Sequence, residues 1–108
     1  MSDLHGSFDI LAALRDPEEL CMDMVGCPEL VAKAGLHVAE GYAEAFRRNY
    51  ALVAKAGQGS TTWCPLYHPG PAYVPSCDFW CMVSPKVAER YILPTLLVEM
   101  KLFERSLF

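Results

Sequence analysis

One long amphipathic segment constrains the fold most: it runs from about Pro28 to Lys55, about a quarter of the 108 residues. Its inward-facing positions recur every three or four residues, as they do on one face of an α-helix. They are Val31, Ala34, Val38, Tyr42, Ala45, Phe46, Asn49, Tyr50 and Val53. Gly57 and Gly59 follow as helix stop signals. A helix of this kind gains most of its stability from packing, so it needs other elements to cover its apolar face.

Two shorter helices are predicted before this segment. Residues 7–14 place their apolar side chains at helical spacing. Asp16 and Pro17 interrupt the run, and Pro17 then begins a second helix. Glu18 and Glu19 occupy the first turn of that helix, where its macrodipole favours acidic side chains.

The last predicted helix extends from Ser84 to about Phe103. Ser84 is a favourable N-cap, and Pro85 fits the first helical position because its missing N–H has no partner there. Pro94 lies inside the helix and is expected to kink or divide it. The apolar face is expected to consist of Leu93, Leu96, Leu97 and Met100.

Strand signals lie between and beyond the helices. Residues 60–66 contain threonine and tryptophan, residues 1–6 could be the tail of a strand, and residues 106–108 could begin another. Strands that alternate with helices favour a parallel sheet. We therefore expect a helix-rich α/β chain with two or three short parallel strands. Since both ends fall on strands, residues 1–108 are expected to be one partial domain, a fragment of a (β/α)8 TIM barrel, which takes ~250 residues.

The composition excludes some function classes. The net charge is −4 without a basic run, which argues against nucleic-acid binding. No apolar stretch approaches the ~18 residues that a membrane span needs. Five cysteines give no obvious disulfide framework, and the first residues do not read as a signal peptide, so we expect a cytoplasmic chain with reduced thiols. Apolar residues make up 53% and charged residues 20%, which predicts either a part of a larger core or a subunit that buries a face against a partner, with self-association possible.

Several short motifs occur in an order that resembles the uroporphyrinogen decarboxylase-like superfamily. Residues 3–11 (DLHGSFDIL) resemble its strand end, small-residue turn and helix. Residues 14–20 (LRDPEEL), then Asp23 and residues 27–31 (CPELV), resemble a second pattern of the superfamily. Asp78-Phe79, Ser84-Pro85 and residues 92–94 (ILP) resemble its aspartate, serine-proline and leucine-proline signature. The resemblance covers nearly the whole chain.

The resemblance implies a TIM-barrel enzyme that decarboxylates a porphyrinogen-type substrate, or that transfers methyl groups with a corrinoid or a thiol. A decarboxylase would need no cofactor, whereas a methyltransferase would use zinc or a corrinoid. The substrate would be a tetrapyrrole or another small molecule. The alternative is a truncated, catalytically inactive fragment that acts only by association with another chain. The chain by itself is not expected to be active, because a barrel site is assembled from several strand ends.

Asp78 and His5 are the candidate catalytic residues, because functional groups in parallel barrels follow the carboxyl ends of strands. Asp78 precedes Phe79 and Trp80, an apolar setting that could raise the pKa of a carboxyl group or aim it at a pyrrole. Histidine can transfer protons near neutral pH, and Asp3 beside it is a candidate substrate contact. The alternatives are an aspartate that caps the next turn and a loop histidine bonded to backbone.

Tyr67, His68 and Trp80 are candidate substrate-binding residues, since aromatic side chains can line a pocket for a planar ligand or simply pack. A set of zinc-ligand types also occurs, consisting of Cys64, His68, Cys77 and Cys81. Buried cysteines more often behave as small apolar residues than as metal ligands, so we do not expect a metal site here.

Overall fold

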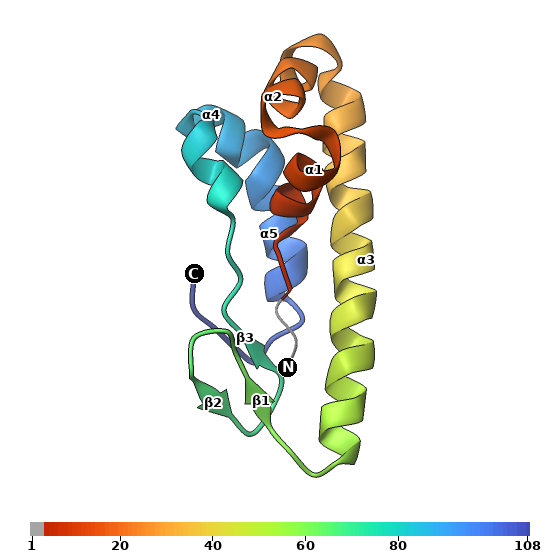
Figure 1. The fold of residues 1–108 in the computed structure, drawn as a ribbon, viewed down its shortest axis with the longest axis vertical. Helices are drawn as coiled ribbons and strands as arrows, with labels where there is room; N and C mark the ends of the chain where they lie inside the picture. The colour runs from red at the N-terminus through yellow and green to blue at the C-terminus, as the bar shows by residue number, and fades with distance from the viewer. Residues whose placement is uncertain (1–3) are drawn as a thin grey trace.

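Helix α3 (Pro28–Lys55) runs along the length of the molecule in the computed structural model, which describes residues 4–108 (Figure 1). Its bounds are those predicted from the sequence. Helices α1 (Ser7–Arg15), α2 (Pro17–Gly26) and α5 (Leu93–Met100) pack against it. Because the other elements are arranged along α3, the described part of the chain is elongated, with extents of 48 × 20 × 20 Å.

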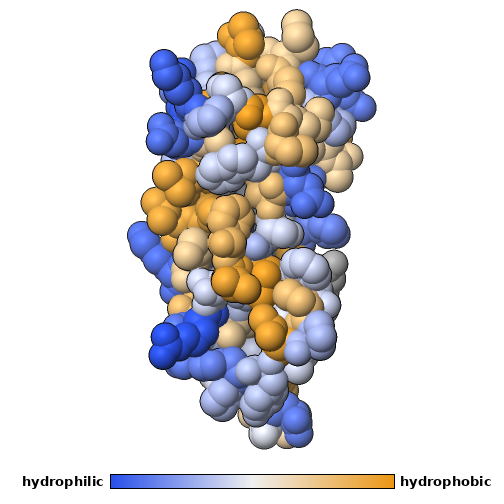
Figure 2. Space-filling view, turned by 90° about the vertical axis from the view of Figure 1, so that its left-hand side faces the viewer, coloured by the Kyte–Doolittle hydropathy of each residue, from blue (hydrophilic) through white to orange (hydrophobic). Residues whose placement is uncertain are grey.

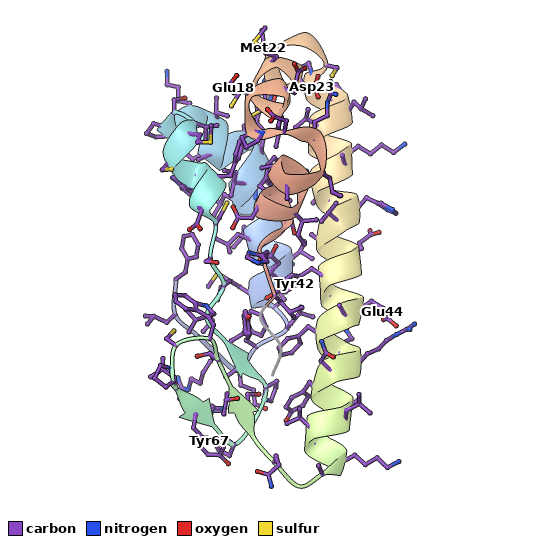
Figure 3. All side chains as sticks on the ribbon, in the orientation of Figure 1. Glu18, Met22, Asp23, Tyr42, Glu44 and Tyr67 are labelled. Atoms are coloured by element: carbon purple, nitrogen blue, oxygen red, sulfur yellow. The ribbon has the colours of Figure 1, made fainter. Side chains whose placement is uncertain are left out.

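The side of α3 that is buried carries smaller residues than the sequence predicted. Val31, Tyr42 and Phe46 are buried, as expected, but Gly35 and Ala39 lie between them on the packed face. A Cβ atom at Gly35 would lie 2.7 Å from Cε2 of Phe8 and 3.2 Å from Cγ2 of Thr95. The glycine therefore allows α1 and α5 to approach the backbone of α3. Glu44 projects from the outer side of the helix (Figure 3).

Asp16 separates α1 from α2 and caps the second helix. Its backbone adopts a positive φ of 79°, and its carboxylate accepts hydrogen bonds from the N–H groups of Glu18 at 2.9 Å and Glu19 at 3.4 Å. Aspartate is among the non-glycine residues that are enriched at positive φ, and it caps helices well. The predicted break between the two helices is thus confirmed.

The last helical region consists of α4 (Pro85–Val87), a π-helical segment η2 (Ala88–Ile92) and α5. Pro94 lacks the N–H that would bond to the carbonyl four residues earlier, and the widened π turn precedes it directly. The predicted start at Ser84 and the disruption near Pro94 are confirmed. The predicted burial of Leu97 is wrong, since this side chain is 51% exposed, whereas Leu96 is buried.

Four two-residue strands are present within residues 4–108. Strands β1 (Ser60–Thr61) and β2 (Tyr67–His68) pair antiparallel, and β3 (Ala72–Tyr73) pairs parallel with β4 (Arg105–Ser106). The expectation of parallel strands throughout is therefore wrong for β1 and β2. The connection of residues 62–66 is too short for a parallel crossover, which needs a dozen or more residues. Strands β3 and β4, in contrast, are joined through the whole last helical region.

Two apolar clusters hold these elements together. One joins α1, α2, the beginning of α3, the 3-10 helix η1 (Asp78–Met82) and η2, with Phe8 stacked on Phe79 at a centroid distance of 6.2 Å. The other joins the middle of α3 to β3 and the chain after α5, where Phe46 meets Phe103 edge-on at 4.8 Å. The strands are thereby fixed near one end of α3 and η1 near the other.

The described chain is thus a helix-rich α/β structure with a few short strands, which confirms the coarse class predicted from the sequence. None of the helices within residues 4–108 has the length and apolar character that crossing a bilayer requires. Figure 2 shows one long face, on which apolar side chains interrupt the hydrophilic surface over much of its height.

Candidate functional site

His5 and Asp78, the two predicted catalytic residues, line the same open cleft, which has a volume of about 800 Å³. Both side chains are exposed to solvent. Asp9 and Cys81 also line the cleft, together with the turn between α1 and α2. The apolar burial expected around Asp78 is not present, because Phe79 turns into the first apolar cluster and leaves the carboxylate outside.

Two chain segments that run side by side bring His5 and Asp78 together. The N–H of Leu4 donates to the hydroxyl of Tyr73 at 2.6 Å, and a Cβ atom at Gly6 would collide with the carbonyl oxygen of Ser76. Residues 4–6 therefore lie beside the segment that comes after β3, and the two segments run in the same direction. Each segment then turns into a helix at the cleft, α1 in one case and η1 in the other.

Asp9 joins these two segments, and the sequence did not single it out. Its carboxylate accepts hydrogen bonds from the N–H groups of Asp78 at 3.1 Å and Phe79 at 2.9 Å. An acidic residue in the first turn of a helix is commonplace, because it interacts with the macrodipole of its own helix. No signal in the sequence connects Asp9 with residues that lie 69 and 70 positions later.

A buried carboxyl group lies behind the cleft and fixes the start of α1. Glu99 of α5 is 1% exposed, and it accepts hydrogen bonds from both the hydroxyl and the N–H of Ser7, the latter at 2.9 Å. Burial raises the pKa of the Glu99 carboxyl group above its ordinary value; the bonds from Ser7 oppose this rise and nearby Asp9 adds to it.

Cys77 lies between these carboxylates and is poorly suited to bind metal. Burial raises the pKa of its thiol to about 12, and the negative charge of Asp9 contributes in the same direction. A cysteine binds zinc as the thiolate, which this environment disfavours. Within residues 4–108, no group of three or more His, Cys, Asp or Glu side chains is placed to hold a metal ion. The predicted set of Cys64, His68, Cys77 and Cys81 does not fit zinc.

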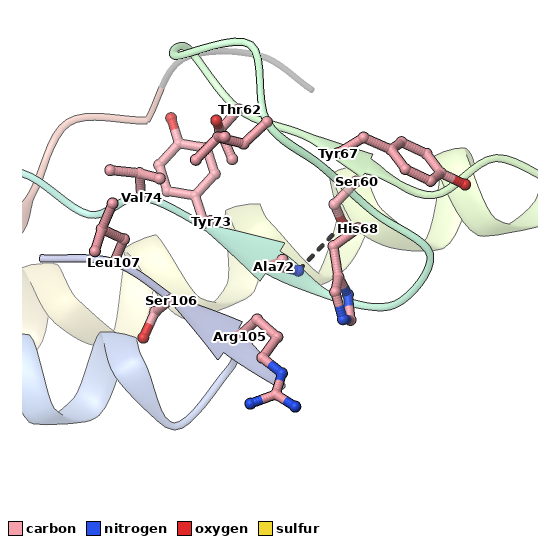
Figure 4. A pocket seen from close by; sticks show the side chains of 11 residues that line it. Ser60, Thr62, Tyr67, His68, Ala72, Tyr73, Val74, Arg105, Ser106 and Leu107 are labelled. Carbon is pink, nitrogen blue, oxygen red and sulfur yellow. Dashed lines mark hydrogen bonds between the residues drawn. The ribbon is translucent and has the colours of Figure 1, made fainter.

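The predicted binding residues Tyr67 and His68 line a different pocket, of about 240 Å³, over the short strands (Figure 4). Nδ1 of His68 accepts a hydrogen bond from the N–H of Gly70 at 3.0 Å, so this histidine is bonded to backbone. Trp80 lies against the ring of Phe108 at a centroid distance of 5.8 Å and does not line the His5 cleft. Asp3 lies outside the described residues.

The cleft combines the carboxylates of Asp9, Asp16 and Asp78 with an imidazole and little free positive charge. Arg15 lies at its edge, but its guanidinium is bonded to Asp23 at 2.7 Å, and this contact lowers the pKa of Asp23 and raises that of Arg15. A carboxylate accepts hydrogen bonds and stabilises cations, whereas imidazole both gives and takes protons. The arrangement suits a ligand with N–H donors or a cation that forms during reaction.

Comparisons with known proteins give no relative: no protein family, curated protein or solved structure matches the chain.

Proposed function

We propose that this chain contributes a substrate cleft to an enzyme of the uroporphyrinogen decarboxylase-like kind, with His5 and Asp78 as its reacting groups. The substrate would be a porphyrinogen or a related small molecule that carries a carboxymethyl side chain on a pyrrole ring. The barrel as a whole would be larger than the 108 residues of this chain.

The observation that carries this proposal is the position of His5 and Asp78 on one cleft: His5 lies within one of two segments that run in the same direction, and Asp78 follows the other. In (β/α)8 barrels the catalytic groups follow the carboxyl ends of parallel strands. The parallel pairing of β3 with β4 through the intervening helices is the kind of connection from which such barrels are built.

The chemistry of the two side chains suits decarboxylation. A proton adds to a carbon of the pyrrole ring, and the ring nitrogen becomes cationic. The bond to the carboxylate then breaks, CO2 leaves, and its bonding electrons neutralise the ring. A second proton takes the place of CO2, and the ring loses the first. Asp78 would accept the pyrrole N–H bonds and stabilise the cation, and His5 would exchange the protons.

Methyl transfer through a zinc-bound thiolate is the weaker form of this proposal. It needs several ligands at one point, and the candidate ligands lie on the β1–β2 hairpin and beside α1, without converging. Methyl transfer with a corrinoid would use the same cleft. Hydroxocobalamin is therefore tested beside uroporphyrin.

A titration followed by amide NMR tests the proposal. Uroporphyrin, the oxidised and stable relative of the porphyrinogen, is added to the protein, and hydroxocobalamin is added in a parallel sample. We expect uroporphyrin to shift the amide signals of His5, Asp78 and Phe79. Asp78→Asn should weaken binding at least about tenfold, because it removes a charged acceptor. Glu40→Gln, an exposed change on α3, is the matched control and should bind as the unmodified protein does.

Three results would contradict the proposed site. The first is the absence of any shift at the cleft, and the second is a response confined to the pocket of Tyr67 and His68. The third is equal binding by Asp78→Asn and Glu40→Gln. A response to hydroxocobalamin alone would replace decarboxylation by corrinoid-dependent methyl transfer.

A non-enzymatic role in association with another chain is the second candidate, and exposed apolar side chains favour it. Large non-aromatic apolar side chains at least 60% exposed occur on α1, α2, α3 and the C-terminal residues. They are Leu14, Met22, Val25, Leu30, Leu52 and Leu107. Such a protein would show no ligand response at the cleft and would associate through these residues.

A further inference from the structure

We propose that Asp9 is a positioning residue, which holds Asp78 at the cleft by capping the helix η1 from outside. The inference rests on the proposed function, because it concerns the same cleft. Asp9 itself need not contact the substrate: its carboxylate is already occupied by two backbone N–H groups.

The hydrogen bonds show why η1 depends on Asp9. The first N–H groups of a helix have no partner within the helix, and a side chain just before it usually accepts them. Cys77 occupies that place in η1 and makes no such bond with its side chain. Asp9 of α1 supplies the missing acceptor from the neighbouring segment.

The same carboxylate also fixes the position of Asp78 relative to His5. Asp9 lies in the first turn of α1, four residues after His5, and the beginning of α1 is held by Glu99 through Ser7. Any shift of η1 relative to α1 would have to break the two bonds to Asp9. Hydrogen bonds to a charged group are stronger than neutral ones, so they limit that movement.

Asp16 provides a matched control within the same cleft. It is also an aspartate, it also lines the cleft, and it also accepts two backbone N–H groups. Its bonds, however, go to its own helix α2 and not to the segment that carries Asp78. Both bonds of Asp16 use the same oxygen, which asparagine keeps as its amide oxygen, so Asp16→Asn removes the charge without removing the cap. A general effect of losing a negative charge at the cleft should therefore be equal in Asp16→Asn and Asp9→Asn.

The experiment compares Asp9→Ala, Asp9→Asn and Asp16→Asn by amide hydrogen exchange, uroporphyrin titration and thermal melting. In Asp9→Ala we expect the amides of Asp78 and Phe79 to exchange at least about tenfold faster, since both acceptors are lost. Uroporphyrin binding should weaken by a similar factor. Asp9→Asn keeps one acceptor oxygen and should recover part of both effects. Asp16→Asn should leave the exchange of the Asp78 and Phe79 amides unchanged, and it measures how much the loss of one negative charge at the cleft alters uroporphyrin binding.

The outcomes separate the inference from the proposed function. If the unmodified protein binds uroporphyrin at the cleft and Asp9→Ala binds equally well, the positioning role is wrong and the function stands. If the unmodified protein does not bind, the function fails, and the exchange rates still decide whether Asp9 holds η1. If the amides of Asp78 and Phe79 are unaffected in Asp9→Ala, or are affected equally in Asp16→Asn, the inference is overturned. Asp9→Asn gives the same comparison if Asp9→Ala does not fold.

Discussion

The buried carboxyl group of Glu99 makes a specific pH dependence testable at the scale of a residue. The folded protein holds the Glu99 proton more tightly than the unfolded chain, in which glutamate titrates near 4.5. The stabilisation is therefore fully present below that pH, and it is lost as the pH rises through the raised pKa of Glu99. Relative to the unmodified protein, Glu99→Gln should therefore gain free energy of unfolding between acid and neutral pH, because it has no proton to lose.

Urea denaturation at a series of pH values measures this difference. Glu89→Gln is the control, because Glu89 is exposed on the π-helical segment. Its curve should run parallel to that of the unmodified protein. The interpretation of Glu99 would be wrong if the curve for Glu99→Gln were parallel as well.

The cysteine thiols give a second prediction at this scale. With a pKa of about 12, Cys77 is a thiolate for only about 1 part in 10⁴ at pH 8. Cys81 is exposed at the cleft. Iodoacetamide should therefore modify Cys81 at least about a hundredfold faster than Cys77, because the thiolate is the reacting species.

Mass spectrometry of peptides after timed labelling would measure the two rates. In urea, where the burial of Cys77 is removed, the rates should become similar. Equal rates in the folded protein would show that Cys77 is neither buried nor close to the two carboxylates.

The packing of α3 is decided at the scale of the element, and two of its glycines distinguish packing from helix propensity. Gly35→Ala places a methyl group against Phe8 and should lower the free energy of unfolding by about 1–3 kcal/mol through overpacking. Gly41 lies in the same helix with nothing within 4 Å of its would-be Cβ atom. Gly41→Ala should raise the free energy of unfolding by about 0.5–1 kcal/mol, because alanine is the better helix former.

Chemical denaturation of the two variants under identical conditions checks this prediction. The free energy of unfolding should change in opposite directions: it should fall in Gly35→Ala and rise in Gly41→Ala. If Gly35→Ala were as stabilising as Gly41→Ala, α1 and α5 would not pack against α3 as closely as the structure has them.

At the scale of the whole molecule, the elongated shape and the exposed apolar side chains favour association. The radius of gyration is 14.5 Å, whereas a compact chain of this length has about 13 Å. Apolar side chains that remain exposed, including Leu14 and Val25, are available to a second copy or another chain. We expect the sedimentation coefficient to increase with protein concentration. A coefficient independent of concentration, together with a sharp cooperative melt, would contradict this expectation.

The sequence by itself determined where α2, α3 and α4 begin. Pro17, Pro28 and Pro85 each occupy the first position of a helix, and Asp16 and Ser84 cap the helices that follow them. These signals work because capping and the fixed φ of proline act over a few residues. The coarse class, helix-rich with few strands, follows from the same local rules. His5 and Asp78 line one cleft, and their role as a site stays a prediction.

Only the tertiary structure decided which elements meet. The antiparallel pairing of β1 with β2, the burial of Gly35 and the bonds from Asp78 and Phe79 to Asp9 all depend on contacts between elements. Helical spacing specifies a stripe on α3, but the neighbours that approach it decide which part is covered and how closely. An aspartate in the first turn of α1 has the same local chemistry whether or not η1 lies beside it. Its partner lies some 70 residues away, and only the folding of the intervening chain brings the two together.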